Sequence, residues 1–384
     1  MKRSFVKSRG SGSNRPARYL SRTSIAPGEE FDRIPEPSFA GVFQALEEGA
    51  AGQAEREIEY DQSEVPSSAS ATTLLPDATR NIIATNQSPD IPFSQSINPY
   101  KGCEHGCVYC YARPTHAYLD LSPGLDFEQR IFFKTNVAES LDHALTRKNY
   151  QCSTIAMGTN TDPYQPAEKR LRITRLVLER MLAYKHPVSI VTKSQLVLRD
   201  LDLLVPLAQQ GLVTVNLSVT TLNDHLKGKL EPRTANGSAR LRAVRSLADH
   251  GVPVGVMVAP VIPFVNDEEL ENIVSASADA GAQMVRYILL RLPQEVEGLF
   301  VEWLQYHYPD RAKRVMSAIK SARQGKAYRS EWHTRMVGEG PVAQLIAQRF
   351  KAAVTRHGLH QAELPALRTD LFNPQVFEPQ QSLF

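Results

Sequence analysis

Residues 98–116 read NPYKGCEHGCVYCYARPTH and place Cys103, Cys107 and Cys110 within eight positions of one loop. The whole chain of 384 residues has only four cysteines, and such a cluster is more typical of a metal site than of disulfides. Structural zinc usually takes four ligands as two separated pairs, but no second pair follows downstream. Three thiolates suit a cubane iron-sulfur cluster, whose fourth iron is then open. A Cys3His zinc site completed by His105 is the alternative.

The segments around this loop alternate short β-rich runs with stretches of helical spacing, which is typical of βαβ units and a parallel sheet. The predicted strands are Ser94–Asn98, Thr154–Gly158, Val188–Thr192, Val213–Val219, Val252–Ala259 and Met284–Leu290. The predicted helices are Ile173–Tyr184, Asp200–Gln210, Ser238–His250, Glu268–Ala280, Leu299–Tyr308, Arg311–Arg323 and Val342–His357. Gly211, Gly251 and Gly281 stand where three of these helices should end, as C-cap residues. Six βα units without a Gly-rich GxGxxG turn predict an α/β fold, a partial TIM-like (βα)6 barrel rather than a dinucleotide-binding sheet.

The two ends of the chain differ in character from this repeat. Residues 1–27 hold seven basic and no acidic residues, whereas residues 28–65 hold eleven acidic residues against two basic ones. We therefore expect a disordered N-terminal extension over residues 1–85, first basic and then acidic. The barrel core is predicted over residues 90–310, and C-terminal helices with an extended tail over residues 311–384.

Composition also bounds the function. A content of 42% hydrophobic and 22% charged residues excludes a wholly disordered chain. The longest apolar stretch, Val252–Val265, contains three prolines and is too short to cross a membrane. The N-terminus lacks the apolar core of about 7–15 residues that a secretory signal needs. We therefore expect a cytoplasmic protein that does not enter membranes. The net charge of +3 neither requires nor excludes binding to nucleic acid.

At the cysteine loop the sequence resembles the radical S-adenosylmethionine (SAM) superfamily, whose motif CxxxCxΦC, with Φ aromatic, is matched by Cys103, Cys107, Tyr109 and Cys110. The resemblance implies that the three thiolates hold a [4Fe-4S] cluster whose open iron binds SAM. It further implies reductive cleavage of SAM to a 5'-deoxyadenosyl radical, which abstracts a hydrogen atom from a substrate. An electron donor of the flavodoxin or ferredoxin type is implied as a partner.

Over about residues 94–300 the sequence is most similar to spore photoproduct lyase and its relatives. The shared segments are CxxxCxYCY, the turn TxTDPYQPxE, TKS, the serine at the end of the fourth strand, LEPRT and GVPVGVMVAP. Carried over by position, the resemblance implies that Tyr109 lies beside the adenine of SAM and that Lys193 faces its carboxylate. The remaining contacts that it implies are Thr159 and Asn160 at the amino group, Ser218 at the ribose or carboxylate, and the backbone near Ala259 at the adenine edge. The GGE pattern of many radical SAM enzymes is absent, and residues 159–162 stand in its place.

One departure bears on the reaction. Spore photoproduct lyase returns a hydrogen atom to its product radical from a cysteine at the end of the second strand, where this chain has Gly158 or Thr159. The fourth cysteine, Cys152, precedes that strand, and we expect it to be a partly buried structural thiol. The sequence leaves the substrate and the catalytic residues unassigned.

Nucleic acid is one candidate substrate, because basic residues follow the cysteine loop and the second strand, where they can line a phosphate backbone. They are Arg113, His116, Arg130, Lys134, Arg170 and Arg172. The competing interpretation is a non-catalytic zinc or iron-sulfur binding module that engages nucleic acid or a protein partner.

Overall fold

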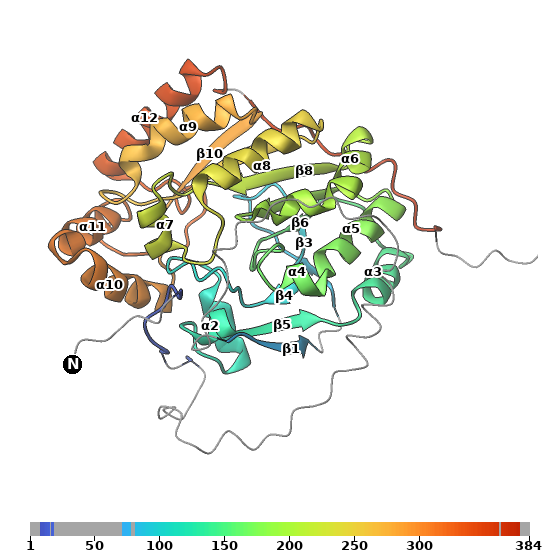
Figure 1. The fold of residues 1–384 in the computed structure, drawn as a ribbon, viewed down its shortest axis with the longest axis horizontal. Helices are drawn as coiled ribbons and strands as arrows, with labels where there is room; N and C mark the ends of the chain where they lie inside the picture. Colours follow the sequence, from blue (N-terminus) through green and yellow to red (C-terminus); the bar gives the residue numbers. More distant parts are fainter. Residues whose placement is uncertain (1–7, 16, 19–70, 78–80, 361, 377–384) are drawn as a thin grey trace, which may run out of the picture.

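The protein is described by a computed structural model that covers residues 8–15, 17–18, 71–77, 81–360 and 362–376 (Figure 1). Within these residues, a seven-stranded sheet has the order β10-β9-β8-β7-β6-β3-β2. From β3 to β10 each strand pairs in parallel with the next, and β2 is antiparallel to β3. The strands are β2 (Ile83–Thr85), β3 (Gln95–Ile97), β6 (Ile155–Met157), β7 (Val188–Thr192), β8 (Val213–Ser218), β9 (Val254–Val261) and β10 (Met284–Leu289). All six predicted strands are confirmed, and their order along the chain is their order in the sheet.

Helices cover the outer face of this sheet (Figure 1). Those that follow the strands are α4 (Glu168–Leu171), α5 (Ile173–Ala183), η4 (Gln195–Asp200), α6 (Leu201–Gln209), α7 (Asp224–Leu230), α8 (Gly237–Asp249), η5 (Asp267–Glu269) and α9 (Leu270–Asp279). The C-terminal helices are α10 (Glu295–His307), α11 (Pro309–Ser321) and α12 (Gly340–Arg356). All seven predicted helices are present within a few residues of their expected bounds. The parallel sheet with its crossover helices confirms the partial α/β barrel.

Three glycines end helices as the sequence predicts. Gly211, Gly251 and Gly281 have φ angles of 70°, 73° and 88°, a left-handed conformation that favours glycine. After α6, the Gly211 amide donates to Ala208 and the Leu212 amide donates to Leu207, which is the Schellman pattern. Each glycine reverses the chain so that the next strand begins at once.

Burial explains why the strands read as apolar runs. Every residue of β8 is buried, as is typical of a central parallel strand in an α/β fold. Val188, Val213 and Val254 are all fully buried and lie near the start of their strands. Polar side chains gather instead just beyond the carboxyl ends of the strands, where reactive groups collect in such barrels.

A second, three-stranded sheet has the order β1-β5-β4 and was not predicted. It comprises β1 (Thr73–Asp77), β4 (Tyr100–Lys101) and β5 (Arg130–Lys134), and β1 pairs in parallel with β5. Helices η3 (Arg113–Leu119), α2 (Asp126–Gln129) and α3 (Val137–Leu145) flank it along the chain.

The structure differs here from the extension predicted over residues 1–85, because β1, β2 and residues 8–18 other than residue 16 have defined positions. Residues 1–7, 16, 19–70 and 78–80 lie outside the described residues, so the disorder expected there stays a prediction, as do the proposed domain boundaries. No helix in the described part of the chain has the length and apolar character needed to cross a membrane.

Candidate active site

The cysteine loop lies between β4 and η3, at the carboxyl ends of the barrel strands. Gly102 and Gly106 have φ angles of 83° and 70°, so two left-handed turns shape the loop. Cys103 and Cys107 are each 8% exposed, and Cys110 is half-buried. The Cys103 amide donates to the Phe127 carbonyl at 2.8 Å, which fixes the start of the loop against α2.

The three thiols interact electrostatically. Burial raises the pKa of Cys107 to about 12, with the carboxylate of Glu231 and the thiol of Cys110 adding to the rise. Burial also raises the pKa of Cys103, and Asp162, Cys107 and Cys110 raise it further. Thiols that disfavour each other's ionisation in this way are stabilised as thiolates when they bind cationic iron.

The donor set fits an iron-sulfur cluster. Among the described residues, no three His, Cys, Asp or Glu side chains form a group that could hold a single metal ion. A cubane cluster does not need such convergence, because each thiolate binds a different iron at a different corner. The residues that would hold it are Cys103, Cys107 and Cys110.

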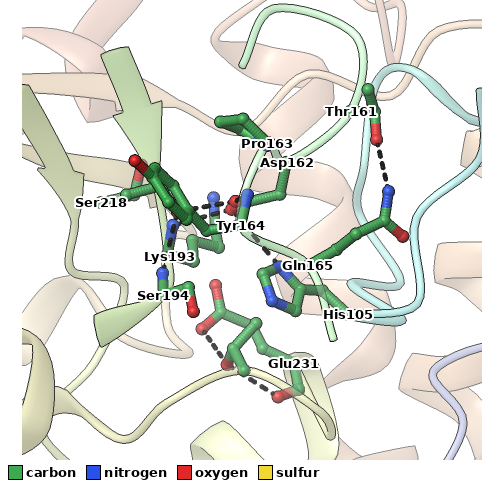
Figure 2. A network of polar contacts seen from close by, with 12 residues as sticks. His105, Thr161, Asp162, Pro163, Tyr164, Gln165, Lys193, Ser194, Ser218 and Glu231 are labelled. Atoms are coloured by element: carbon green, nitrogen blue, oxygen red, sulfur yellow. Dashed lines mark hydrogen bonds and ion pairs between the residues drawn. The ribbon is translucent and has the colours of Figure 1, made fainter. Parts of the chain in front are cut away.

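One wall of the loop is the turn after β6, with the sequence TDPYQP. The Thr161 hydroxyl donates to the Gly102 carbonyl at 2.7 Å, and the Gln165 side chain accepts from the Glu104 amide at 2.9 Å. Asp162 is nearly buried, and its Oδ2 lies 3.3 Å from Nδ1 of His105 (Figure 2). Burial alone would raise the pKa of Asp162, but His105 and hydrogen bonds from Thr192 and the Lys193 amide hold it at about 2. His105 therefore connects the cysteine loop to Asp162 in the turn after β6.

The opposite wall is the LEPRT segment after α7. The Val108 amide donates to the Leu230 carbonyl at 3.1 Å, and the Arg233 amide donates to the His105 carbonyl at 3.3 Å. Glu231 is fully buried and forms an ion pair with Arg240, which is also buried. Burial would raise the pKa of Glu231, but the charges of Arg240 and Lys193 hold it at about 2.

Tyr109 connects the loop to this buried charge. Its hydroxyl donates to the Glu231 carboxylate and lies 3.3 Å from the Thr220 hydroxyl. Burial and Glu231 raise the pKa of Tyr109 well above its usual range, so the phenol stays neutral. The ring thus stands rigidly inside the site, as a stacking surface for a planar group requires.

Lys193 supplies a positive charge at the same place. It follows β7 directly, and its ammonium lies 6.0 Å from the centre of the Tyr109 ring. Within the part of the chain that the structure describes, this ammonium makes no hydrogen bond or ion pair. Burial opposes its protonation, but Cys107 and Glu231 together raise the pKa of Lys193 above its ordinary value. The side chain is a protonated donor without a fixed acceptor, and Figure 2 shows it beside Asp162 and near Glu231.

The other predicted SAM contacts lie on neighbouring strand ends. Thr159 and Asn160 follow β6, where the Asn98 side chain accepts from the Thr159 hydroxyl at 3.2 Å and the Asn160 amide at 3.0 Å. Ser218 is buried at the end of β8, and its hydroxyl makes no hydrogen bond among the described residues. The Ala259 carbonyl, in β9, accepts from the Thr220 hydroxyl at 3.0 Å. The six predicted cofactor residues thus lie at the carboxyl ends of four strands or in the loop, although SAM contacts themselves stay a prediction.

Several residues that shape the site were missed from the sequence. Asn98 and Gln165 were within quoted motifs but carried no assigned role, and Arg240 lies in a helix far along the chain. Arg291, two residues beyond β10, stacks over the Tyr111 ring at 4.6 Å. No acidic partner or hydrogen bond satisfies its guanidinium within the described residues. The one signal for it in the sequence is its position directly after the predicted strand Met284–Leu290.

Part of the basic rim proposed from the sequence is wrong. Arg113 and His116 are fully buried, and Arg113 pairs with Glu128 at 2.5 Å. Lys134 is buried against Asp77 at 2.8 Å. These three side chains hold the fold together and cannot reach a phosphate backbone, whereas the exposed residues are Arg130, Arg170 and Arg172.

Comparisons with known proteins agree with this site. A sequence model of the Radical SAM superfamily matches residues 97–276, which include the cysteine loop and the ends of β6 to β9. The uncharacterized protein Rv2578c of Mycobacterium tuberculosis (strain ATCC 25618 / H37Rv) is 40% identical over 236 residues, which are 60% of this chain and 69% of that protein. The chain belongs to the radical SAM superfamily.

More distant relatives extend the same pattern. The uncharacterized protein MJ0683 of Methanocaldococcus jannaschii is 27% identical over 215 residues, covering 56% of this chain and 76% of the relative. Among solved structures, a variant of spore photoproduct lyase has a TM-score of 0.58 at 15% identity, covering 84% of this chain and 92% of the lyase. The lyase complexed with dinucleoside spore photoproduct has a TM-score of 0.55 at 16% identity, covering 75% and 80% of the two chains. These likenesses establish a shared fold.

This radical SAM chain has no thiol at the end of β6. Gly158 has a φ of 92°, and a Cβ atom there would lie 2.0 Å from the Val191 carbonyl oxygen. Cys152 is half-buried ahead of the strand, and burial raises its pKa to about 11. A cysteine cannot replace Gly158 without moving β7, whereas the neighbouring position already carries the side chain of Thr159.

Proposed function

We propose that this chain is a radical SAM enzyme in which Cys103, Cys107 and Cys110 bind a [4Fe-4S] cluster and Lys193 binds the carboxylate of SAM. The observation that carries the proposal is the unpaired ammonium of Lys193, which lies beside the Tyr109 ring of the cysteine loop and interacts electrostatically with Cys107. An ammonium on a flexible stem is well suited to a carboxylate at a strand mouth. The neutral Tyr109 ring, held by Glu231, gives the adenine a stacking surface.

A bound and reduced cluster would supply one electron to cleave the sulfonium of SAM into methionine and a 5'-deoxyadenosyl radical, and that radical would take a hydrogen atom from the substrate. The residues of the chain are proposed to bind SAM, to orient it and to shield it from water. Thr159 and Asn160 are fixed by Asn98 near the end of β6, where they are proposed to face the amino group. Ser218 offers a free hydroxyl from β8, and the Ala259 backbone is proposed to lie at the adenine edge.

The substrate is proposed to carry a negative charge. Arg291 is largely removed from water, and burial lowers its pKa, with Arg335 lowering it further. A desolvated guanidinium without an acid gains most from an anionic ligand. A carboxylate or phosphate beside Tyr111 would meet this need. We favour nucleic acid, because a solved structure of similar fold is complexed with dinucleoside spore photoproduct; the phosphate contact itself is proposed from Arg291 alone.

The cell must supply the reducing electron. A flavodoxin or ferredoxin type of donor is proposed, because a low-potential cluster needs an equally low-potential reductant. A cytoplasmic location is proposed, because three unbridged thiols stay reduced there.

The test is SAM cleavage under strict anaerobiosis. The protein is reconstituted with iron and sulfide, reduced with dithionite and mixed with SAM, and 5'-deoxyadenosine is quantified. The native protein should form it, and a variant with Cys103, Cys107 and Cys110 all changed to Ala should not. A colourless protein that binds zinc and forms none would contradict the proposal and would favour the non-catalytic binding module.

A further inference from the structure

A short N-terminal segment lies against the cysteine loop, far from it in sequence. The segment comprises residues 9–13, with the sequence RGSGS, and we call it the N-terminal strap. Arg9 is 4% exposed and Ser11 is 1% exposed, although charged and serine residues are usually at the surface. Figure 1 shows the dark-blue segment that includes the strap beside α2. Such burial requires specific partners.

The strap fits because of two glycines. A Cβ atom on Gly10 would lie 1.5 Å from the carbonyl oxygen of Gly106 and 3.2 Å from the amide nitrogen of Val108. At the end of the strap, a Cβ atom on Gly124 would lie 2.0 Å from the carbonyl oxygen of Ser13. Neither position tolerates a side chain while the strap is in place. The backbone of the strap therefore touches the two residues that flank Cys107.

A buried carboxylate joins the strap to the loop. Glu128 is fully buried and accepts from the Gly10 amide at 3.1 Å and the Ser11 amide at 2.9 Å. The same carboxylate accepts from Arg113, whose Nε donates to the Cys107 carbonyl at 2.9 Å. Two strap amides thus donate hydrogen bonds to the Glu128 carboxylate. That carboxylate holds Arg113, and Arg113 in turn holds the backbone of Cys107.

The strap also reaches the first part of the loop. Arg9 donates to the Glu128 carbonyl at 2.7 Å and to the Thr72 hydroxyl at 3.3 Å. Thr72 in turn donates to the side chain of Glu104 at 2.6 Å, one residue beyond Cys103. Farther along, the Ser13 hydroxyl donates to Glu302 on α10 at 2.8 Å, which anchors the far end. The loop is therefore held on a third side, in addition to the TDPYQP turn and the LEPRT segment.

We propose that the N-terminal strap is a working part of the cysteine site: its residues position the loop through Glu128 and Arg113 and shield Cys107 from solvent. The inference deepens the proposed function, because the shielded thiol is one that would hold the cluster. The strap residues are positioning residues and touch neither substrate nor cofactor. The basic, glycine-rich composition of this segment does not predict that it positions the cysteine loop.

Alkylation of the thiols tests the strap without any cluster. Full-length apoprotein is treated with iodoacetamide under reducing conditions, and the labelling rate of each cysteine is read by mass spectrometry. Gly10→Ala and Gly124→Ala should each displace the strap, the first by a change in the strap itself and the second by a change in a residue that contacts Ser13. Both should label Cys107 about tenfold faster than the native protein, as expected for a segment that opens locally. Cys152 should label at the native rate in both variants.

Gly228→Ala is the matched control, because a Cβ atom at Gly228 in α7 would meet nothing within 4 Å. Its labelling rates should equal those of the native protein. Native labelling of Cys107 in both strap variants would overturn the proposal, and so would faster labelling of every cysteine, which would indicate general unfolding. Because alkylation needs neither iron nor SAM, failure of the strap is distinguishable from failure of SAM cleavage.

Cluster retention gives a second readout on the reconstituted protein. Iron released to an excess of chelator is followed by the loss of visible absorbance, without turnover. The Gly10→Ala and Gly124→Ala variants should release iron about tenfold faster than the native and Gly228→Ala proteins. Release at the native rate would overturn the shielding role.

Discussion

The carboxylate of Asp162 accepts the backbone amide of Lys193 at 2.8 Å, which ties the turn after β6 to the end of β7. The same carboxylate accepts from the Thr192 hydroxyl at 2.6 Å and contacts His105 in the cysteine loop. One buried acid thus fixes the backbone of the lysine and leaves its ammonium free beside the Tyr109 ring, where it interacts electrostatically with Cys107. The geometry assigns different roles to the backbone and the side chain of Lys193.

Replacing the lysine should therefore impair SAM binding and leave cluster assembly intact. Lys193→Met removes the ammonium but preserves the apolar stem, so the dissociation constant for SAM should rise by about 10–100-fold, the usual loss for a charged hydrogen bond. Equilibrium dialysis of the reconstituted protein measures it, alongside iron content. Lys351→Met, on the exposed face of α12, is the control. Native SAM affinity in Lys193→Met would exclude the assigned role.

The buried pair of Glu231 and Arg240 predicts a distinct pH dependence of stability. The pKa of Glu231 is lowered from 4.5 to about 2, so its ionised form stabilises the fold above pH 4.5. That contribution, about 3 kcal/mol, should be lost as the pH falls from 4.5 toward 2.

Urea unfolding across this range measures the effect in the native protein and in Glu231→Gln. The variant should be less stable at neutral pH, because Arg240 is left buried without its acid. Its free energy of unfolding should also fall less steeply with acid than that of the native protein. Glu363→Gln, at a position 82% exposed, should keep the native slope. Equal slopes in native protein and Glu231→Gln would refute the assigned pKa.

Gly158 should resist substitution. Its left-handed backbone and the close approach of Val191 predict that Gly158→Ala lowers the free energy of unfolding by about 1–3 kcal/mol. Gly228→Ala, in the middle of α7, should instead raise it by about 0.5–1 kcal/mol. Chemical denaturation of both variants gives the comparison. A Gly158→Ala protein as stable as the native one would show that β7 can yield at this point.

Arg291 should govern affinity for an anionic substrate. Binding of a single-stranded oligothymidylate to the reconstituted protein is the probe, measured by fluorescence anisotropy at several salt concentrations. Arg291→Met should weaken binding by about tenfold and reduce the salt slope by about one, as the loss of one phosphate contact predicts. Arg356→Met, exposed at the end of α12, should have no effect. If Arg291→Met bound the oligothymidylate as tightly as the native protein, Arg291 would not contact the substrate.

The barrel could be predicted from the sequence because its signals are local. Each strand is a short apolar run, and each following helix carries its own periodicity and, in three cases, its own C-cap glycine. The cysteine loop is equally local, since its spacing is contained in eight residues. These features need no knowledge of distant contacts.

The features that were missed depend on distant contacts. β1 pairs with β5 across more than 50 residues, and its five residues TLLPD contain a proline that argues against a strand. Arg113 looked available for phosphate because its partner Glu128 lies in another element. The N-terminal strap has the composition of a flexible tail, and its position is set by close contacts with Gly106 and Gly124, which are distant in the sequence. Pairings of this kind are set by the folded chain and leave no periodic pattern.

The most direct test of the account is electron paramagnetic resonance of the reconstituted, dithionite-reduced protein before and after addition of SAM. Three protein thiolates leave one iron open, so the native protein should hold about four irons and give a [4Fe-4S]+ signal that changes when SAM binds. Cys110→Ala should lose that signal. A cluster signal that SAM leaves unchanged, or a protein that takes up zinc and gives no signal, would contradict an open iron bound to SAM at these three cysteines.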